Sequence, residues 1–243
     1  QGNGGKIIVW ADGTTRYFGN ISADGAGAGG NGGFVETSGK ETLIATGQVS
    51  ARASDGLAGT WLLDPNNITI QAAGSNTNVT ASPNFTSTND SAIVTTGSIQ
   101  TALNAGTSVA VTTGSGGTNS QPGNITVASP IAKTAGGNAT LTLNAVNNIV
   151  FNTGANVTST AGALGLTLNA GGAINTMRSI SLNGGTLTLN ATGAVTQSSA
   201  ITGNTSVVKN GAGIFTLSQN NTYTGATTIN AGTLALGAAN RIA

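Results

Sequence analysis

The pentapeptide LTLNA occurs three times in this sequence, at residues 141–145, 166–170 and 187–191. Two looser copies follow, VVKNG at 207–211 and TTINA at 227–231. The asparagine of each copy recurs at intervals of roughly 20–25 residues, a period typical of solenoid proteins. The five recurring residues are Asn144, Asn169, Asn190, Asn210 and Asn230.

Each period is composed of short strand-like segments. Leu141 and Leu143 alternate with Thr142, and IVF at 149–151 and VT at 157–158 also have strand character. Strands this short cannot cover their own apolar face, but they can when they stack in register about 4.8 Å apart. The sequence therefore predicts an all-β chain folded as a parallel β-helix. At about 22 residues a coil, it would form about eleven coils in a rod roughly 50 Å long.

Two stretches depart from this pattern. SIQTALNAG at 98–106 predicts one short helix, with Ser98 as N-cap and Gly106 as the residue that stops it. Residues 71–97 are rich in Asn, Thr and Ser and predict irregular or loop-rich coils. We therefore expect a single β-helical unit over residues 1–243, in which 1–70, 98–206 and 207–243 form successive groups of coils.

A glycine-rich stretch at 25–33 contains a literal G-x-G-x-x-G at Gly27, Gly29 and Gly32. A dinucleotide-binding loop needs a helix after the third glycine, whereas FVETSG at 34–39 has strand character. A phosphate-binding P-loop is also excluded, because Gly33 and Gly39 enclose one residue too many and Glu41 follows Lys40. Glycines at coil corners explain the stretch better, because glycine accepts positive φ at little cost. No cofactor is predicted.

The composition excludes several classes of function. There is no Cys and no His, so Ser-His or Cys-His catalysis and a disulfide framework are excluded, and no zinc site is expected. A net charge of +1 gives no reason to expect a nucleic-acid partner. Charged residues are only 6% of the chain, although 38% hydrophobic residues are enough for a core. No apolar run reaches the roughly 20 residues of a membrane-spanning helix.

The acidic side chains are the remaining candidates for catalysis. A glycosidase needs two carboxylates across a cleft. Most acids here precede Gly or Pro in turn-like contexts, or flank Lys40, and the repeated spacing of calcium-binding β-rolls is missing. We therefore predict neither a catalytic residue nor a metal site. The acids concerned are Asp12, Asp24, Glu36, Glu41, Asp55, Asp64 and Asp90.

Three stretches resemble known exported proteins. Residues 29–70, from GGNGGFVETSGKE to TWLLDPNNITI, resemble the haemagglutinin-repeat region of two-partner-secretion exoproteins of the filamentous-haemagglutinin and high-molecular-weight-adhesin type. SIQTALNAGTSVAVTT at 98–113 continues that resemblance. VVKNGAGIFTLSQNNTYTGATTINAGTLALG at 207–237 is similar to the passenger-associated repeat of autotransporters.

The resemblance implies a right-handed β-helical shaft on the surface of a Gram-negative bacterium, or secreted from it, and export through a partner barrel in the outer membrane. It also implies that Asn-x-Ser/Thr sequons are candidate glycosylation sites, since some high-molecular-weight adhesins are glycosylated at such sites. The sequons singled out are Asn67, Asn124, Asn138 and Asn190. The start at Gln1 lacks a signal peptide, so we expect a segment of a longer protein.

The recurring asparagines have two structural interpretations. Stacked in successive coils, their amides can hydrogen-bond along the rod as a ladder. Each can instead be an independent turn residue that tolerates a left-handed backbone. The regular recurrence favours the ladder. Among the few aromatic residues, Trp61 lies in the apolar TWLL and is predicted to be buried.

Three functions stay open at this point. The first is a non-catalytic shaft segment of a surface adhesin, which binds a host-cell receptor or glycan or displays other binding regions. The second is a carbohydrate-active β-helix that uses acids from the first ninety residues on a polysaccharide. The third is a homophilic biofilm or filament module that binds copies of itself.

Overall fold

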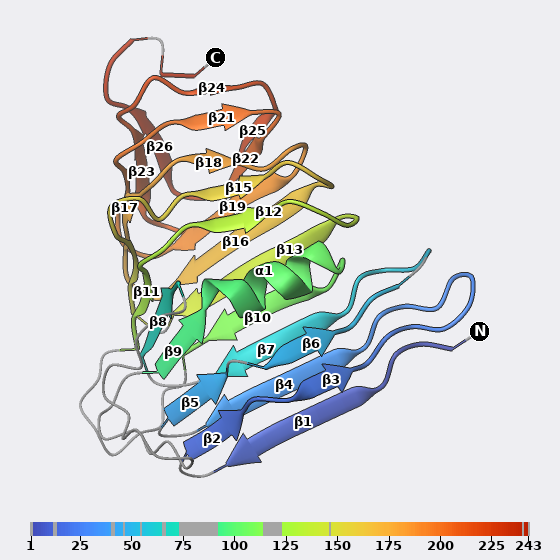
Figure 1. Ribbon diagram of the computed structural model, residues 1–243. Helices are drawn as coiled ribbons and strands as arrows, with labels where there is room; N and C mark the ends of the chain where they lie inside the picture. The colour runs from blue at the N-terminus through green and yellow to red at the C-terminus, as the bar shows by residue number, and fades with distance from the viewer. Residues whose placement is uncertain are drawn as a thin grey trace.

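The computed structural model describes residues 2–11, 14–39, 42–45, 47–53, 55–64, 67–72, 92–113, 123–145, 147–239 and 241–242. In this part of the chain every pairing between the strands is parallel, and the strands stack into a solenoid that rises from the N-terminus to the C-terminus (Figure 1). The predicted all-β parallel solenoid with a single short helix is therefore confirmed.

Sheet 1 has nine strands, which follow one another in chain order. Its strands are β1 (Lys6–Ala11), β4 (Phe34–Gly39), β7 (Thr60–Asp64), β10 (Ser108–Thr112), β13 (Ala139–Ala145), β16 (Leu164–Ala170), β19 (Thr186–Ala191), β22 (Ser206–Lys209) and β25 (Thr227–Ile229). The three LTLNA copies form β13, β16 and β19 and pair in register, Leu141 with Leu166 and Leu166 with Leu187.

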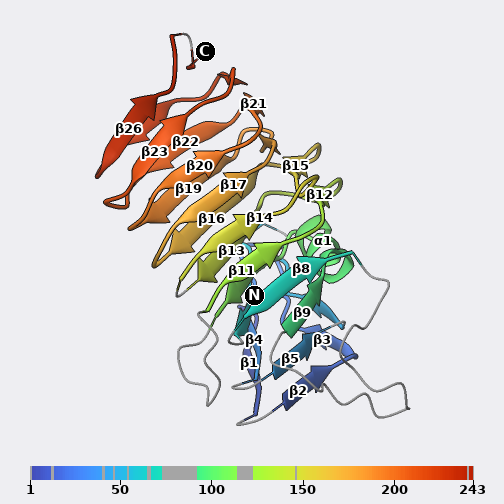
Figure 2. The same ribbon diagram turned by 90° about the vertical axis from the view of Figure 1, so that its left-hand side faces the viewer.

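Sheet 2 forms the second side of the solenoid (Figure 2). In spatial order its strands are β2 (Thr14–Tyr17), β5 (Thr42–Ala45), β9 (Ala92–Thr95), β8 (Ile68–Gln71), β11 (Ile125–Val127), β14 (Ile149–Phe151), β17 (Ile174–Met177), β20 (Val195–Gln197), β23 (Ile214–Leu217) and β26 (Thr233–Leu236). The chain order is broken once, because β9 lies between β5 and β8.

The third side is divided in two by the helix. Below it sheet 4 pairs β3 (Asn20–Ser22) with β6 (Gln48–Ser50). Above it sheet 3 contains β12 (Ile131–Lys133), β15 (Val157–Ser159), β18 (Ile180–Ser181), β21 (Ile201–Gly203) and β24 (Thr222–Tyr223). Helix α1 (Thr96–Asn104) packs against both β6 and β12 and so takes the place of one strand (Figure 1).

Side chains complete the hydrogen bonding where α1 interrupts the stack. A helix uses its backbone groups internally, so the N–H groups of the neighbouring strands need other acceptors. Gln100 Oε1 accepts from the Ala132 N–H at 2.7 Å, and Asn104 Oδ1 accepts from the Thr134 N–H at 2.8 Å. Below the helix, Thr107 Oγ1 accepts from the Ala51 N–H at 2.8 Å. The helix is therefore an integral part of the stack.

The boundaries of α1 correct one prediction. The N-cap is Thr95, whose hydroxyl accepts from the Ser98 N–H, so the predicted cap Ser98 lies inside the first turn and is buried. Gly106 stops the helix as predicted, with φ +78°. The N–H of Gly106 donates to Leu103 O and that of Thr107 to Ala102 O, which is a Schellman cap. The predicted loop-rich stretch 71–97 also contains strand β9; residues 73–91 lie outside the described residues.

The core is a stack of aliphatic and aromatic rows. In β13 and β16 the side chains alternate strictly between buried and half-exposed, as the LTLNA pattern predicts. Trp61 is fully buried, as predicted, and its indole N–H donates to Thr37 Oγ1 at 3.0 Å. Each fully buried Leu or Val stabilises the fold by about 1.5–3 kcal/mol. One inward row of sheet 1 consists of Val35, Trp61, Val109, Leu141, Leu166, Leu187 and Val207.

The coils of the N-terminal half are longer than those of the C-terminal half. Strand β7 pairs through Thr60 with Ser108 of β10, and the long stretch of chain between them contains β8, β9 and α1. Leu187 of β19, by contrast, pairs with Val207 of β22, and only two short strands lie between them. The expected eleven coils are therefore too many, because that number assumed the short length throughout. Since the N-terminal coils are longer, sheet 1 has only nine strands in the part of the chain that the structure describes.

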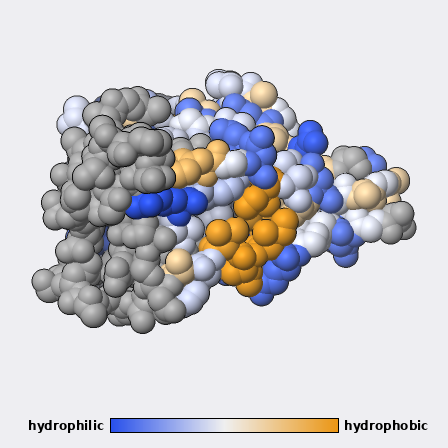
Figure 3. Space-filling model, turned by 60° about the horizontal axis from the view of Figure 1, so that its bottom comes forward, coloured by the Kyte–Doolittle hydropathy of each residue, from blue (hydrophilic) through white to orange (hydrophobic). Residues whose placement is uncertain are grey.

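The end of the solenoid formed by β1 carries an apolar patch, which hydrophilic residues border in Figure 3. Ile8 and Trp10 of β1 are about half exposed, while Ile7 and Ile21 are only partly buried against the core. Among the described residues no helix is long and apolar enough to cross a membrane.

Candidate functional site

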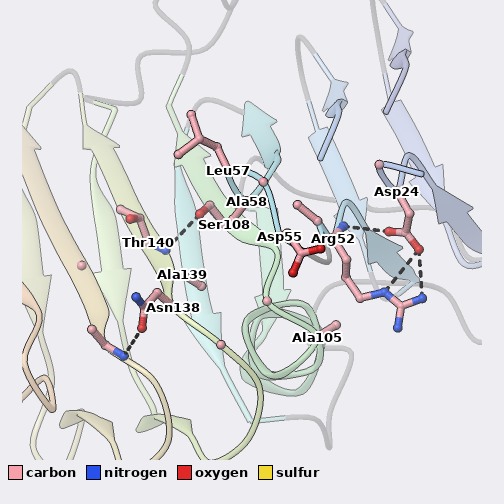
Figure 4. A pocket seen from close by; sticks show the side chains of 17 residues that line it. Asp24, Arg52, Asp55, Leu57, Ala58, Ala105, Ser108, Asn138, Ala139 and Thr140 are labelled. Atoms are coloured by element: carbon pink, nitrogen blue, oxygen red, sulfur yellow. Dashed lines mark hydrogen bonds and ion pairs between the residues drawn. The ribbon is translucent and has the colours of Figure 1, made fainter. Parts of the chain in front are cut away.

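A groove of about 1000 Å³ lies beside the C-terminal end of α1 (Figure 4). We call it the α1 groove. Its charged and polar lining residues are Asp24, Arg52, Asp55, Ser108, Asn138 and Thr140, and most of its other lining residues are Gly or Ala. Leu57, with 76% of its surface exposed, stands at its rim.

The long coils create this groove. Asp24 and Arg52 follow the strands of sheet 4, and Asp55 and Leu57 belong to the corner that leads into β7. The chain leaves α1 at Gly106, whose left-handed backbone turns it straight into β10. Small residues at these corners leave the surface hollow, and the groove therefore lies where the helix meets the solenoid.

The acidic side chain of Asp24 is held by several donors. Its Oδ1 accepts from Ser50 Oγ and from the Arg52 N–H at 2.7 Å, and its Oδ2 forms an ion pair with Arg52 Nη2 at 3.0 Å. Burial by itself raises the pKa of Asp24, but the hydrogen bonds from Ser50 and Arg52 and the positive charge of Arg52 outweigh it, so the pKa is lowered. A carboxyl group with a lowered pKa is a poor proton donor for glycoside cleavage.

The other acids are scattered. Asp55 lines the α1 groove and is exposed, while Glu36 lies on the outer face of β4 in sheet 1. Asp12, Glu41 and Asp90, and the side chain of Asp64, lie outside the described residues. Within the part of the chain that is described, no group of three His, Cys, Asp or Glu could hold a metal ion.

The five recurring asparagines follow sheet 1, but their amides form two separate rows. Asn169 Nδ2 donates to Asn144 Oδ1 at 2.6 Å, and Asn190 Nδ2 donates to Asn169 Oδ1. Asn144 Nδ2 in turn donates to Thr112 Oγ1 at 2.9 Å. Asn230 Nδ2 donates to Asn210 Oδ1 at 2.7 Å. A single ladder of five is therefore wrong.

The break coincides with the end of a strand. Strand β22 ends at Lys209, whereas β19 continues through Asn190 to Ala191. The Asn210 N–H still donates to Leu189 O at 3.0 Å, as in a regular parallel pair, so only the side-chain row is interrupted. Asn190 Oδ1 is consequently buried without a hydrogen-bond partner among the described residues.

A second asparagine row was missed by the sequence analysis. Asn67 Oδ1 accepts from the Asn124 N–H at 2.6 Å, and Asn124 Oδ1 accepts from the Asn148 N–H at 3.0 Å. Asn148 Oδ1 continues the row to the Ala173 N–H at 2.8 Å. All three asparagines immediately precede an Ile that begins a strand of sheet 2, so the recurring Asn-Ile pair was the available signal.

The candidate glycosylation sites all take part in contacts between coils. Asn67 and Asn124 belong to the second row, and Asn190 belongs to the first. Asn138 is exposed at the α1 groove, and its Oδ1 accepts from the Ala163 N–H at 2.8 Å. Glycosylation of these residues stays a prediction.

Two lysines are fully buried, a feature that the sequence analysis also missed. Lys133 Nζ donates to the carbonyl oxygens of Ala135, of Gly136 at 3.1 Å and of Ala161 at 2.6 Å. Lys209 Nζ donates to Gly211 O. Desolvation lowers the pKa of both lysines. Their ammonium groups satisfy corner carbonyls, which is a structural role.

Comparison with known proteins supports part of the sequence interpretation. Residues 207–236 match the passenger-associated-transport-repeat family, over the coils from β22 to β26. A comparison of the whole chain with curated proteins finds no match. The repeat is found in autotransporter passenger domains. Together with the parallel solenoid, it indicates a passenger-domain-like protein that is secreted or surface-exposed.

Proposed function

We propose that this chain is a non-catalytic shaft segment of a secreted or surface-exposed bacterial adhesin. The observation that supports it most is the passenger-associated repeat at 207–236, built into one continuous stack of parallel strands. Such a stack holds binding surfaces at fixed spacing, because each coil contacts only its neighbours and adds about 4.8 Å. Its partners would be a host-cell receptor or glycan, and an outer-membrane transporter barrel during export.

The absence of catalysis is part of this proposal. The carboxyl group best held in the α1 groove, that of Asp24, is tied to Ser50 and Arg52 and has a lowered pKa. A hydrolase of polysaccharides would need an acid with a raised pKa across from a second carboxylate.

One experiment tests both parts. The 243-residue chain, coupled to beads, is tested for attachment to epithelial cells, and in parallel for release of oligosaccharides from pectin, glucan and chitin. We expect attachment and no release. Release that disappears in Asp24→Asn or Asp55→Asn would establish the carbohydrate-active alternative, and beads that do not attach would contradict the adhesive function.

Self-association is a second candidate, which the apolar patch at β1 favours. Exposed Ile8 and Trp10 next to the partly buried Ile7 offer a surface that a second copy, or a preceding coil of a longer chain, could cover. Sedimentation at increasing concentration tests it. Larger species that Trp10→Ser suppresses would support homophilic binding, and a monomer at every concentration would contradict it.

A further inference from the structure

Gly165 interrupts a row of hydroxyl side chains on the outer face of sheet 1. The residue lies inside β16 and pairs with Thr140, and it lines the α1 groove. We call the row the outer hydroxyl row; it runs Thr60, Ser108, Thr140, Gly165, Thr186 and Ser206. In this row only position 165 lacks a side chain.

No backbone atom is among the nearest neighbours of a Cβ placed at Gly165. These neighbours all belong to the Thr140 side chain, whose Oγ1 would lie at 2.8 Å and would have to shift. By contrast, a Cβ at Gly33 or Gly59 would meet a backbone oxygen of the neighbouring coil at 2.2 Å. Glycine inside a strand weakens it and often marks close approach of a ligand or another chain. At Gly165 it deepens the groove between Thr140 and the next coil.

The groove offers hydrogen-bonding groups and a negative balance of charge. Ser108, Thr140 and Asn138 line one side, where the Ser108 hydroxyl also accepts from the Thr140 N–H at 3.0 Å. On the other side the charge of Arg52 is matched by Asp24, and Asp55 adds a second carboxylate (Figure 4). The carboxyl end of α1 adds partial negative charge, because the negative pole of the helix dipole lies there. Acidic ligands are therefore disfavoured.

The strands beneath the groove leave no edge for an extended peptide. Each of β7, β10, β13 and β16 is paired on both sides within sheet 1. Peptides that bind to sheets add a strand to a free edge or fill apolar pockets. The α1 groove offers instead hydrogen-bonding side chains set among glycine and alanine residues, which suits a ligand rich in hydroxyl groups.

We propose that the α1 groove binds a short oligosaccharide without acidic groups, neutral or amine-bearing, in the space left open by Gly165. The proposal rests on the adhesive function proposed above and assigns it to one site. Sugar hydroxyls would hydrogen-bond with Ser108, Thr140 and Asn138, and an amino group would face Asp55. Because Asp55 leaves the groove with a net negative charge, we also predict that sulfated or uronic-acid sugars are rejected.

Calorimetric titration of the 243-residue chain tests the proposal, with chitohexaose, cellohexaose, the chitosan hexamer and a heparin hexasaccharide as probes. We expect at least one neutral or amine-bearing probe to bind and heparin not to bind. Gly165→Thr, which completes the hydroxyl row and fills the groove, should weaken binding at least about tenfold. Thr186→Val, in the same row on β19 but outside the groove lining, should bind as the wild type does.

A second groove variant is available in case the first does not fold. If Gly165→Thr fails to fold, Asp55→Asn replaces it, and should weaken the chitosan hexamer more than chitohexaose. Equal binding by the groove variants and wild type, binding of heparin alone, or binding of no probe overturns the proposal. If the beads attach to cells but the chain binds no probe, the groove is refuted as a binding site and the adhesive function still stands. If the chain binds a probe through the groove but the beads do not attach, the groove stands and the adhesive function is contradicted.

Discussion

The coils between β13 and β22 are short and nearly equal in length, whereas those between β1 and β13 are longer and unequal. In the short coils nearly every residue belongs to a strand or a tight corner, and Asn144, Asn169 and Asn190 follow one another at equivalent positions. The long coils contain the out-of-order strand β9 and helix α1, and they supply one side of the α1 groove, whose other side includes Thr140 of β13 and Gly165 of β16. The short regular coils therefore form a uniform stack, and the extra residues of the long coils create the surface on which a binding site can form.

The largest effect is expected for the core of the short coils. Leu166→Ala removes a fully buried side chain between Leu141 and Leu187 and should lower the free energy of unfolding by about 2–5 kcal/mol. Leu57→Ala, at the exposed rim of the groove, is the matched control and should change it by less than about 0.5 kcal/mol. Denaturant melts measure both. Equal losses would mean that the long coils also depend on their rim.

The next effect tests the asparagine rows. Asn169→Ala breaks hydrogen bonds on both sides, to Asn144 and Asn190, and should lower the free energy of unfolding by about 1–3 kcal/mol. Asn190→Ala breaks only one such bond and Asn230→Ala only one at an exposed coil, so each should cost less. The double variant of Asn169 and Asn190 should cost less than the sum. Strict additivity would show independent turn residues.

A pH-dependent effect is expected from the buried lysine of the last coils. Desolvation lowers the pKa of Lys209 below its ordinary value of 10.5, so between the native and the ordinary pKa the unfolded chain binds more protons than the native one. Stability should therefore rise with pH across that interval, with a slope of at most about 1.4 kcal/mol per pH unit from this group. Lys209→Met should remove this contribution. Melts of both proteins at several pH values give the difference, and parallel curves would refute the prediction.

The smallest effect compares one glycine in each region. Gly165→Thr should leave the free energy of unfolding unchanged or raise it by less than about 1 kcal/mol, since threonine is favoured in strands. Gly33→Ala should instead lower the free energy of unfolding, because its Cβ would collide with the Gly5 carbonyl oxygen at 2.2 Å. Thermal melts of the two variants decide it. A loss at Gly165 as large as that at Gly33 would mean that both glycines serve packing.

The sequence by itself determined the class of fold and the buried face of the repeated strands. Alternation with period two shows which side chains of a strand share a face, and the regular recurrence of the LTLNA copies shows that equivalent strands stack. Both are local patterns, so Leu141, Leu166 and Leu187 could be assigned to one buried row from the letters alone. The end of α1 at Gly106 was predictable for the same reason, because a helix stop depends on its immediate neighbours.

Only the tertiary structure decided how unequal coils fit together. The ion pair of Asp24 with Arg52 joins residues of different coils that lie far apart in the sequence, and so does the hydrogen bond from the Ala132 N–H to Gln100. The interruption of the asparagine row after Asn190 also lies between different coils. These contacts depend on the number of residues in each corner of the solenoid. In the first half of the chain no sequence repeat fixes that number. The α1 groove arises from the same mismatch, because a helix and long corners leave space that strands in register would fill.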